Sequence, residues 1–229
     1  MIALIRLRNK ITQKFFSEKQ GLIYVLVSYL LVFPIFRIAF RGRTFGNYNV
    51  PKLGPLVVVA NHGSDLDPPI LGHALGRSVS FMAKKELFAI PILAQIIRAC
   101  GAYPVNRGSS DRNAIRAASN VLAQGKAIGV FLDGTRQENG RVNNPMPGAA
   151  LLAARSGAHL LPVAIINSNK AFGRKSKWLR FVPIHLRIGP PVPPPLSRKK
   201  SELEETTKKL QSIINQMLDK GPLAQKELL

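Results

Sequence analysis

A histidine and an aspartate, His62 and Asp67, lie five positions apart in the segment Asn-His-Gly-Ser-Asp-Leu-Asp, residues 61–67. Histidine changes its charge near neutral pH. A carboxylate that accepts a hydrogen bond from one ring nitrogen leaves the other nitrogen to take up a proton. The spacing therefore predicts a general base with an acid partner. Asp65 is a second candidate partner, because spacing does not choose between the two aspartates, and a simple hydrogen-bonded turn is the alternative to a dyad.

Two local elements must position this pair. The apolar run Leu56–Ala60 predicts a buried strand that ends two residues before His62. Two prolines directly follow Asp67, which predicts a helix over residues 68–76 with the Asp67 side chain as its cap. A histidine at the end of a strand and a carboxylate at the start of a helix can face each other across the short loop between them.

The rest of the chain alternates between strand-like and helix-like segments. Strand-like apolar runs occupy residues 56–60, 79–83, 102–105, 127–132 and 159–166, and helix-like patterns occupy residues 68–76, 86–99, 111–124 and 147–156. This order predicts an α/β fold with a largely parallel central sheet flanked by helices. A further strand-like run covers residues 180–188, a proline-rich connector follows it, and residues 198–219 predict an amphipathic terminal helix.

Polar residues follow each of the first four predicted strands. They are His62 and Asp67 after the first, Lys84 and Lys85 after the second, Arg107 after the third, and Asp133, Gly134, Thr135 and Arg136 after the fourth. Because the carboxyl ends of parallel strands meet at one edge of a sheet, these groups are expected to gather there. An acid–base pair surrounded by cations predicts a base beside a phosphate-binding site.

The composition narrows the partners. The chain has 229 residues, with 33 lysines and arginines against 12 acidic residues, and so a net charge of +21. This excess indicates an anionic partner, for which nucleic acid and an anionic membrane are the candidates. The single cysteine, Cys100, excludes an internal disulfide and a cysteine-based zinc site. The other histidines lack the spacing of metal ligands, so no metal is expected.

Residues 1–40 are predicted to form a membrane-anchoring helical segment. Within it, residues 21–36 form a run of sixteen residues without a charge, and basic residues flank the run on both sides. A helix of that length extends about 24 Å, which is shorter than a hydrocarbon core of about 30 Å, and Pro34 interrupts it. The pattern favours an anchor in one leaflet, with both basic flanks at the anionic cytoplasmic surface. An ordinary core helix is the alternative.

A second basic segment covers residues 170–200, with nine lysines and arginines and no acidic residue. It includes Phe172, Trp178 and Phe181. Interleaved basic and aromatic residues are typical of a membrane-interface surface, although nucleic-acid-binding surfaces use the same residues. A solvated basic face is the third interpretation.

With these segments in place, the chain resembles the glycerolipid acyltransferases, specifically the 1-acylglycerol-3-phosphate acyltransferase (PlsC-like) family. The family's first motif is Asn-His followed by four residues and Asp; its match here selects Asp67 over Asp65. The next three motifs resemble residues 101–108, 131–136 and 161–165, in the family's order, so that the resemblance covers about residues 46–190.

Three positions depart from the family pattern. Asp133 stands where the family's third motif has a glutamate, and Asn106 stands where an acid commonly precedes the second motif's arginine. Residues 145–148, Pro-Met-Pro-Gly, lack the basic residue that many members carry there. These departures leave the chemistry in place but leave the identity of the acceptor open.

The resemblance implies transfer of a fatty acyl group from acyl-CoA or acyl carrier protein to the sn-2 hydroxyl of 1-acylglycerol-3-phosphate, giving phosphatidic acid. His62 would be the base and Asp67 its partner, and the absence of a Gly-x-Ser-x-Gly segment agrees with direct attack by the acceptor. The implied substrate-binding residues are Lys84, Lys85, Arg107, Asp133, Gly134, Thr135 and Arg136. No cofactor is implied beyond the thioester co-substrate.

The expected partners are anionic membrane lipids, lysophosphatidic acid and the thioester donor, with no nucleic acid. Residues 41–229 would be the acyltransferase domain, held at the cytoplasmic face of a membrane. Glycerol-3-phosphate or another lysophospholipid is an alternative acceptor, and thioester hydrolysis is an alternative reaction. A non-catalytic basic membrane- or nucleic-acid-binding protein is the alternative of a different class, but such a protein needs no His–Asp pair among its strand ends.

Overall fold

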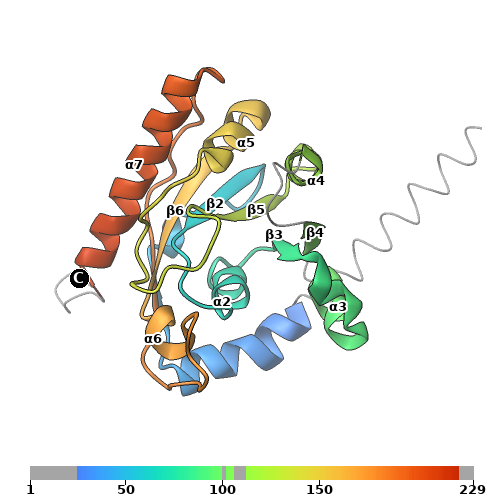
Figure 1. The fold of residues 1–229 in the computed structure, drawn as a ribbon, viewed down its shortest axis with the longest axis vertical. Coiled ribbons are helices and arrows are strands. Elements are labelled where there is room, and N and C mark those ends of the chain that lie inside the picture. Colours follow the sequence, from blue (N-terminus) through green and yellow to red (C-terminus); the bar gives the residue numbers. More distant parts are fainter. Residues whose placement is uncertain (1–24, 100–101, 106–111, 222–229) are drawn as a thin grey trace, which may run out of the picture.

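The computed structural model describes residues 25–99, 102–105 and 112–221, and these fold around a seven-stranded sheet (Figure 1). The strand order is β1-β7-β6-β2-β5-β3-β4. The strands are β1 (Arg43–Phe45), β2 (Leu56–Ala60), β3 (Val79–Lys84), β4 (Tyr103–Val105), β5 (Ala127–Phe131), β6 (His159–Ile166) and β7 (His185–Ile188). Of the neighbouring pairs, β6 and β7 run antiparallel and the others run parallel, which confirms the predicted, largely parallel sheet.

Helices cover both faces of the sheet. The α-helices are α2 (Asp67–Ala74), α3 (Pro91–Ala99), α4 (Arg112–Ala123), α5 (Gly148–Ser156), α6 (Ser168–Phe172) and α7 (Lys200–Asp219). Helices with wider or tighter turns are η1 (Val27–Val32), η2 (Ile35–Ala39), η3 (Asn47–Asn49) and η4 (Lys85–Ala89). Figure 1 shows α5 and α7 on one side of the sheet, with α2 and the N-terminal helical segment on the other.

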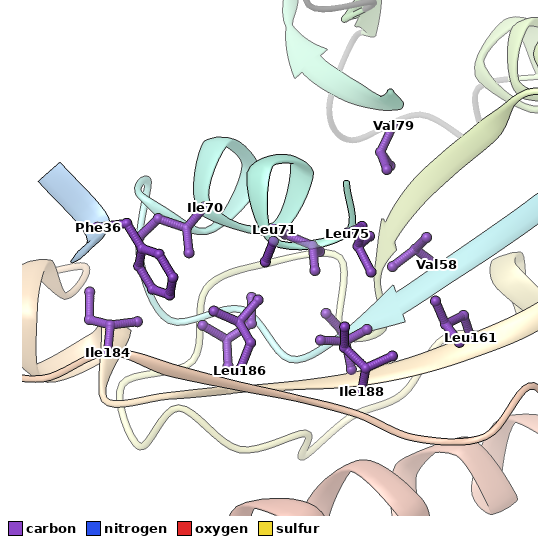
Figure 2. Packing of buried hydrophobic residues seen from close by; sticks show 14 of the residues in the cluster. Phe36, Val58, Ile70, Leu71, Leu75, Val79, Leu161, Ile184, Leu186 and Ile188 are labelled. Carbon is purple, nitrogen blue, oxygen red and sulfur yellow. The ribbon is translucent and has the colours of Figure 1, made fainter. Parts of the chain in front are cut away.

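The two faces of the sheet bury separate apolar clusters. Figure 2 shows the cluster on the α2 side, where Phe36 of η2 lies beside Ile70 of α2, and Leu71 of α2 belongs to the same cluster. The cluster on the other side joins the sheet to α4, α5 and α7. β2 lies at the centre of the sheet and its five residues are all fully buried. Both clusters hold β2 rigidly, so the loop that follows it starts from a fixed point.

The register explains why the predicted site segments share one edge. Ala60, the last residue of β2, pairs with Phe131 of β5 on one side and with Val163 of β6 on the other. All three strands are parallel. Their carboxyl ends therefore meet, and the segments after residues 60 and 131 leave the sheet next to each other.

Two predicted elements differ from the structure. The helix expected over residues 86–99 is divided into η4 and α3, which begins at Pro91, because a residue before proline disfavours the helical conformation. The strand expected over residues 180–188 is confined to β7, His185–Ile188. Pro183 lacks the N–H that a strand between two neighbours must donate. The strand β1 and the helix α6 were not predicted.

The N-terminal helical segment, residues 25–39, packs one face on α2 and exposes the other. Phe36 is buried, and the Ser28 hydroxyl lies 2.8 Å from Nδ1 of His73 in α2. The opposite face exposes Tyr29, Leu30 and Ile38, at 59%, 73% and 76%. None of the helices within the described ranges is both long enough and apolar enough to cross a bilayer. The first 24 residues of the predicted anchor lie outside the described residues.

Candidate active site

His62 and Asp67 form a buried pair at the carboxyl edge of the sheet. His62 Nδ1 lies 2.8 Å from Asp67 Oδ2, and the two side chains are 6% and 0% exposed. Because a carboxylate only accepts hydrogen bonds, this contact assigns the proton to Nδ1 and leaves the lone pair on Nε2. The ring therefore has the orientation and the tautomer that a general base requires, with Nε2 able to accept a proton.

The Asp67 carboxylate also organises the loop that carries His62. Its Oδ2 atom accepts hydrogen bonds from the backbone N–H groups of Gly63 at 2.8 Å and Ser64 at 2.9 Å. Asp67 is the first residue of α2, and Leu66 precedes it at the cap position. The prediction that the Asp67 side chain caps α2 is therefore wrong, because the carboxylate turns back to the preceding loop.

Ser64 is the hydroxyl nearest to His62 in sequence, and it is fully buried. Its Oγ accepts a hydrogen bond from the backbone N–H of Leu66 at 3.1 Å. This contact gives Ser64 a structural role in closing the loop.

The His62 ring stacks on the ring of Phe131, which in turn stacks on the ring of Phe81. It lies parallel to the Phe131 ring, with centroids 3.9 Å apart and an angle of 10° between the planes. Phe131 in turn lies 5.9 Å from Phe81 of β3. Space for Phe81 exists because residue 129 is glycine: a Cβ there would lie 2.0 Å from Phe81 Cε1. Gly129 thus supports the position of His62 through two rings.

Replacing Gly129 with alanine is expected to destabilise the protein by about 1–3 kcal/mol, the usual range for overpacking a core. The new methyl group must displace Phe81, and with it the ring beneath His62. Thermal unfolding of the purified variant measures the loss. Gly148→Ala is a matched control, because a Cβ at Gly148 meets no atom within 4 Å. Equal stability of the two variants would contradict the proposed support.

Asn61 connects the His62 loop to the neighbouring segments. Its Nδ2 donates to the carbonyl oxygens of Gly140 at 2.7 Å and Ile165 at 2.8 Å, and its Oδ1 accepts from the Ile165 N–H at 2.7 Å. The side chain is fully buried, so each of these contacts is protected from water. The sequence interpretation gave Asn61 and Phe131 no role of their own. In the sequence, a role for Asn61 could have been predicted from the position of its amide, directly after a strand of apolar residues.

The loop after β5 lies against the His62 loop. The backbone N–H of Gln137 donates to the carbonyl oxygen of His62 at 2.8 Å. Next to it, Nη1 of Arg136 donates to Oδ2 of Asp65 in an ion pair, with the two side chains 22% and 65% exposed. The two aspartates of the segment therefore have separate partners: Asp67 orients His62, and Asp65 holds Arg136.

Asp133 is engaged within its own loop. Its carboxylate accepts hydrogen bonds from the backbone N–H groups of Asn143 at 3.1 Å and Asn144 at 2.7 Å. Burial raises the pKa of the Asp133 carboxyl above its ordinary value, and these two amides oppose that rise. Gly134 adopts a φ of 64°, which favours glycine, and both it and Thr135 are exposed.

Three predicted site residues remain: Lys84, Lys85 and Arg107. Lys84 is the last residue of β3, and Lys85 begins η4 with an exposed side chain. Arg107 lies outside the described residues. The structure thus brings together His62, Asp67, Asp65 and Arg136. Among the described residues there is no cluster of three or more histidine, cysteine or acidic side chains that could hold a metal ion.

A buried His–Asp pair beside a cation, at the carboxyl edge of a largely parallel sheet, is an arrangement suited to proton abstraction next to an anionic group. Comparison with known proteins gives the family. The Acyltransferase family model matches residues 43–166, more than half of the chain, and the chain belongs to this family. The predicted resemblance to an acyltransferase family is thereby confirmed.

Individual relatives carry more specific names. A 1-acyl-sn-glycerol-3-phosphate acyltransferase of Borreliella burgdorferi is 29% identical over 148 residues, which cover 63% of this chain and 59% of that protein. Another, from Streptococcus pneumoniae, is 35% identical over 149 residues, which cover 64% of this chain and 55% of that protein. The chain spans between 38% and 59% of the length of six such relatives.

The fold is also shared with a solved structure. The crystal structure of the 1-acyl-sn-glycerophosphate (LPA) acyltransferase PlsC from Thermotoga maritima superposes with a TM-score of 0.69. The match covers 94% of this chain and 99% of that chain, at 24% sequence identity. This likeness shows a common α/β architecture.

Proposed function

We propose that this protein transfers a fatty acyl group from an acyl thioester to the sn-2 hydroxyl of 1-acylglycerol-3-phosphate, giving phosphatidic acid. The observation that carries the proposal is the hydrogen bond between His62 Nδ1 and Asp67 Oδ2, which leaves Nε2 as the base. The names of its relatives support lysophosphatidic acid as the acceptor.

In the proposed reaction, the acceptor hydroxyl attacks the thioester carbonyl while Nε2 of His62 removes its proton. The imidazolium that forms is stabilised by the Asp67 carboxylate. A C–O bond forms, the tetrahedral intermediate collapses with cleavage of the C–S bond, and His62 returns the proton to the departing thiolate. No covalent enzyme intermediate is needed, which agrees with the buried, hydrogen-bonded Ser64.

Arg136 and Arg107 are proposed to bind the acceptor's phosphate, because a guanidinium matches phosphate oxygens in charge and geometry. In the structure Arg136 forms an ion pair with Asp65, whose side chain is 65% exposed. Because Asp65 is exposed, its carboxylate can move into solvent when a phosphate binds Arg136. Gly134 and Thr135 lie beside Arg136 in sequence and are proposed to contact the substrate. Asp133 would act by holding their loop, and Lys84 and Lys85 would attract the anionic groups of the donor or the lipid.

Replacing Arg136 with glutamine is expected to raise the KM for lysophosphatidic acid about 10-fold or more, since hydrogen bonds to charged groups contribute about 1.5–3 kcal/mol. The contact forms before the reaction, so kcat should change less. Steady-state kinetics with varied acceptor at saturating donor measures both constants. Arg155→Gln is the control variant, because it removes a cation from the last turn of α5. A change confined to the donor KM would assign Arg136 to the phosphates of the thioester carrier.

The acceptor is tested with purified protein, radiolabelled acyl-CoA and a panel of acceptors. The panel contains lysophosphatidic acid, glycerol-3-phosphate and lysophospholipids with larger headgroups. The proposal predicts labelled phosphatidic acid from lysophosphatidic acid, with much slower reaction of the other acceptors. Preferred use of another acceptor would reassign the substrate, and acyl-CoA consumption without any acceptor would indicate a thioester hydrolase.

The protein is further proposed to be attached to one leaflet of a membrane through its N-terminal segment. The support is the apolar face that residues 25–39 present away from α2, with Leu30 73% and Ile38 76% exposed. An exposed helical face of this kind suits the boundary between headgroups and acyl chains. Attachment there would bring the site close to lipids of the same leaflet.

Single cysteines introduced on both sides of this segment are expected to be labelled from the same face of sealed vesicles. Ala3→Cys and Tyr48→Cys in a Cys100→Ser background provide the two positions, and Tyr48 is 91% exposed. Gly42 is unsuitable, because a Cβ there would lie 2.2 Å from the Phe36 ring. Labelling from opposite faces by an impermeant maleimide would show a segment that crosses the bilayer.

A further inference from the structure

The loop between α6 and β7 exposes an aromatic and basic surface that the acyl-transfer chemistry does not use. Trp178, Leu179 and Phe181 are 82%, 44% and 59% exposed. The cations of the same loop are also exposed: Arg174, Lys175, Lys177 and Arg180. We name residues 174–181 the tryptophan loop. Its apolar side chains are large and lie in water, which marks the loop as a surface with a partner.

Charge restricts the chemistry of that partner. The tryptophan loop carries four cations and no acidic residue. In the described part of the chain, Glu138 is the acid that meets this loop, through an ion pair with Lys175 at 2.8 Å. The remaining cations surround Trp178 and Phe181, so the partner is anionic and also offers an apolar region.

The tryptophan loop is tied to the N-terminal helical segment. Nη2 of Arg41 donates to the carbonyl oxygen of Phe181 at 2.9 Å, and the rings of Phe40 and Phe181 have centroids 5.9 Å apart. The backbone N–H of Ile184 donates to the carbonyl oxygen of Phe40 at 3.1 Å. Figure 1 shows α6 and the loop after it beside one end of the N-terminal helical segment. The two exposed apolar surfaces are therefore neighbours.

We propose that the tryptophan loop is a second membrane-binding element, which inserts Trp178 and Phe181 into the headgroup layer of an anionic bilayer. Indole and phenyl rings favour this layer, and the surrounding cations meet lipid phosphates there. Nucleic acid would use the same cations, but the exposed residues Leu30 and Ile38 of the adjoining N-terminal helical segment are aliphatic and cannot stack on bases. Two attachment elements also fix the rotation of the domain on the membrane, which a single helix does not.

Trp178 is the only tryptophan of the chain, so its fluorescence reports on this loop alone. The full-length protein is reconstituted into vesicles of phosphatidylcholine and phosphatidylglycerol, with or without bromine on the acyl chains near the carbonyl end. The proposal predicts blue-shifted emission, strong quenching by the bromolipid and protection from acrylamide. Flotation with the vesicles is measured separately, and this readout does not depend on acyl transfer. Flotation with emission typical of a water-exposed indole, or no flotation, would overturn the proposal.

Paired charge variants test the role of the cations. Lys177→Gln with Arg180→Gln is expected to weaken binding to anionic vesicles by roughly 30-fold, taking about 1 kcal/mol for each cation near the surface. Lys208→Gln with Lys209→Gln removes the same charge from exposed positions of α7 and should have little effect. Equal effects of the two pairs would refute a specific role of the loop. A Trp178 response to single-stranded RNA but not to vesicles would refute it as well.

Discussion

Replacing His62 with alanine is expected to reduce kcat for acyl transfer by about 10²–10⁴-fold, the range that a positioned general base contributes. Without Nε2, the attacking hydroxyl loses the base that takes its proton. The measurement is the initial rate of phosphatidic acid formation at saturating lysophosphatidic acid and acyl-CoA.

Folding must be separated from chemistry in this test. His62 is 5% exposed and stacked on Phe131, so alanine removes packing as well as the base. His62→Gln retains more of the volume and is the second variant, with thermal unfolding measured for both. A variant that keeps near wild-type activity would exclude His62 as the base.

Replacing Asp67 with asparagine is expected to lower kcat on the order of 10³–10⁴-fold, because a neutral amide no longer stabilises the imidazolium that forms during the reaction. The amide oxygen can still accept hydrogen bonds from the backbone N–H groups of Gly63 and Ser64, so the loop should retain its shape.

Asp65→Asn is the matched control, since it makes the same chemical change two residues away. Asp65 pairs with Arg136, so its replacement should change the acceptor KM, through a freer Arg136, and change kcat little. A larger loss of kcat in Asp65→Asn than in Asp67→Asn would make Asp65 the partner of His62.

Local sequence patterns were sufficient for the parallel centre of the fold. Strands such as β2 and β5 are short apolar runs bounded by polar segments, and helices separate them, so their periodicity predicts a parallel sheet. The strands β1 and β7 were harder to predict from the sequence. β1 has three residues, and β7 runs antiparallel to β6, an orientation that follows from tertiary packing and not from its own residues.

The same distinction applies to the site. The spacing of His62 and Asp67 is local and could be recognised, whereas the choice against Asp65 needed the family pattern. The partner of Asp65 is Arg136, 71 residues away, and the partners of Asn61 are 79 and 104 residues away. Such contacts depend on the strand register, which brings the ends of β2, β5 and β6 together. No local pattern contains that information.

His62 is proposed to activate the acceptor hydroxyl for direct attack on the thioester. CoA release and the intact mass of the wild-type protein, measured with and without lysophosphatidic acid, test it most directly. Direct attack predicts CoA release only when the acceptor is present, in amounts equal to the phosphatidic acid formed, and an unchanged protein mass. CoA release without acceptor, or a protein heavier by one acyl group, would contradict it.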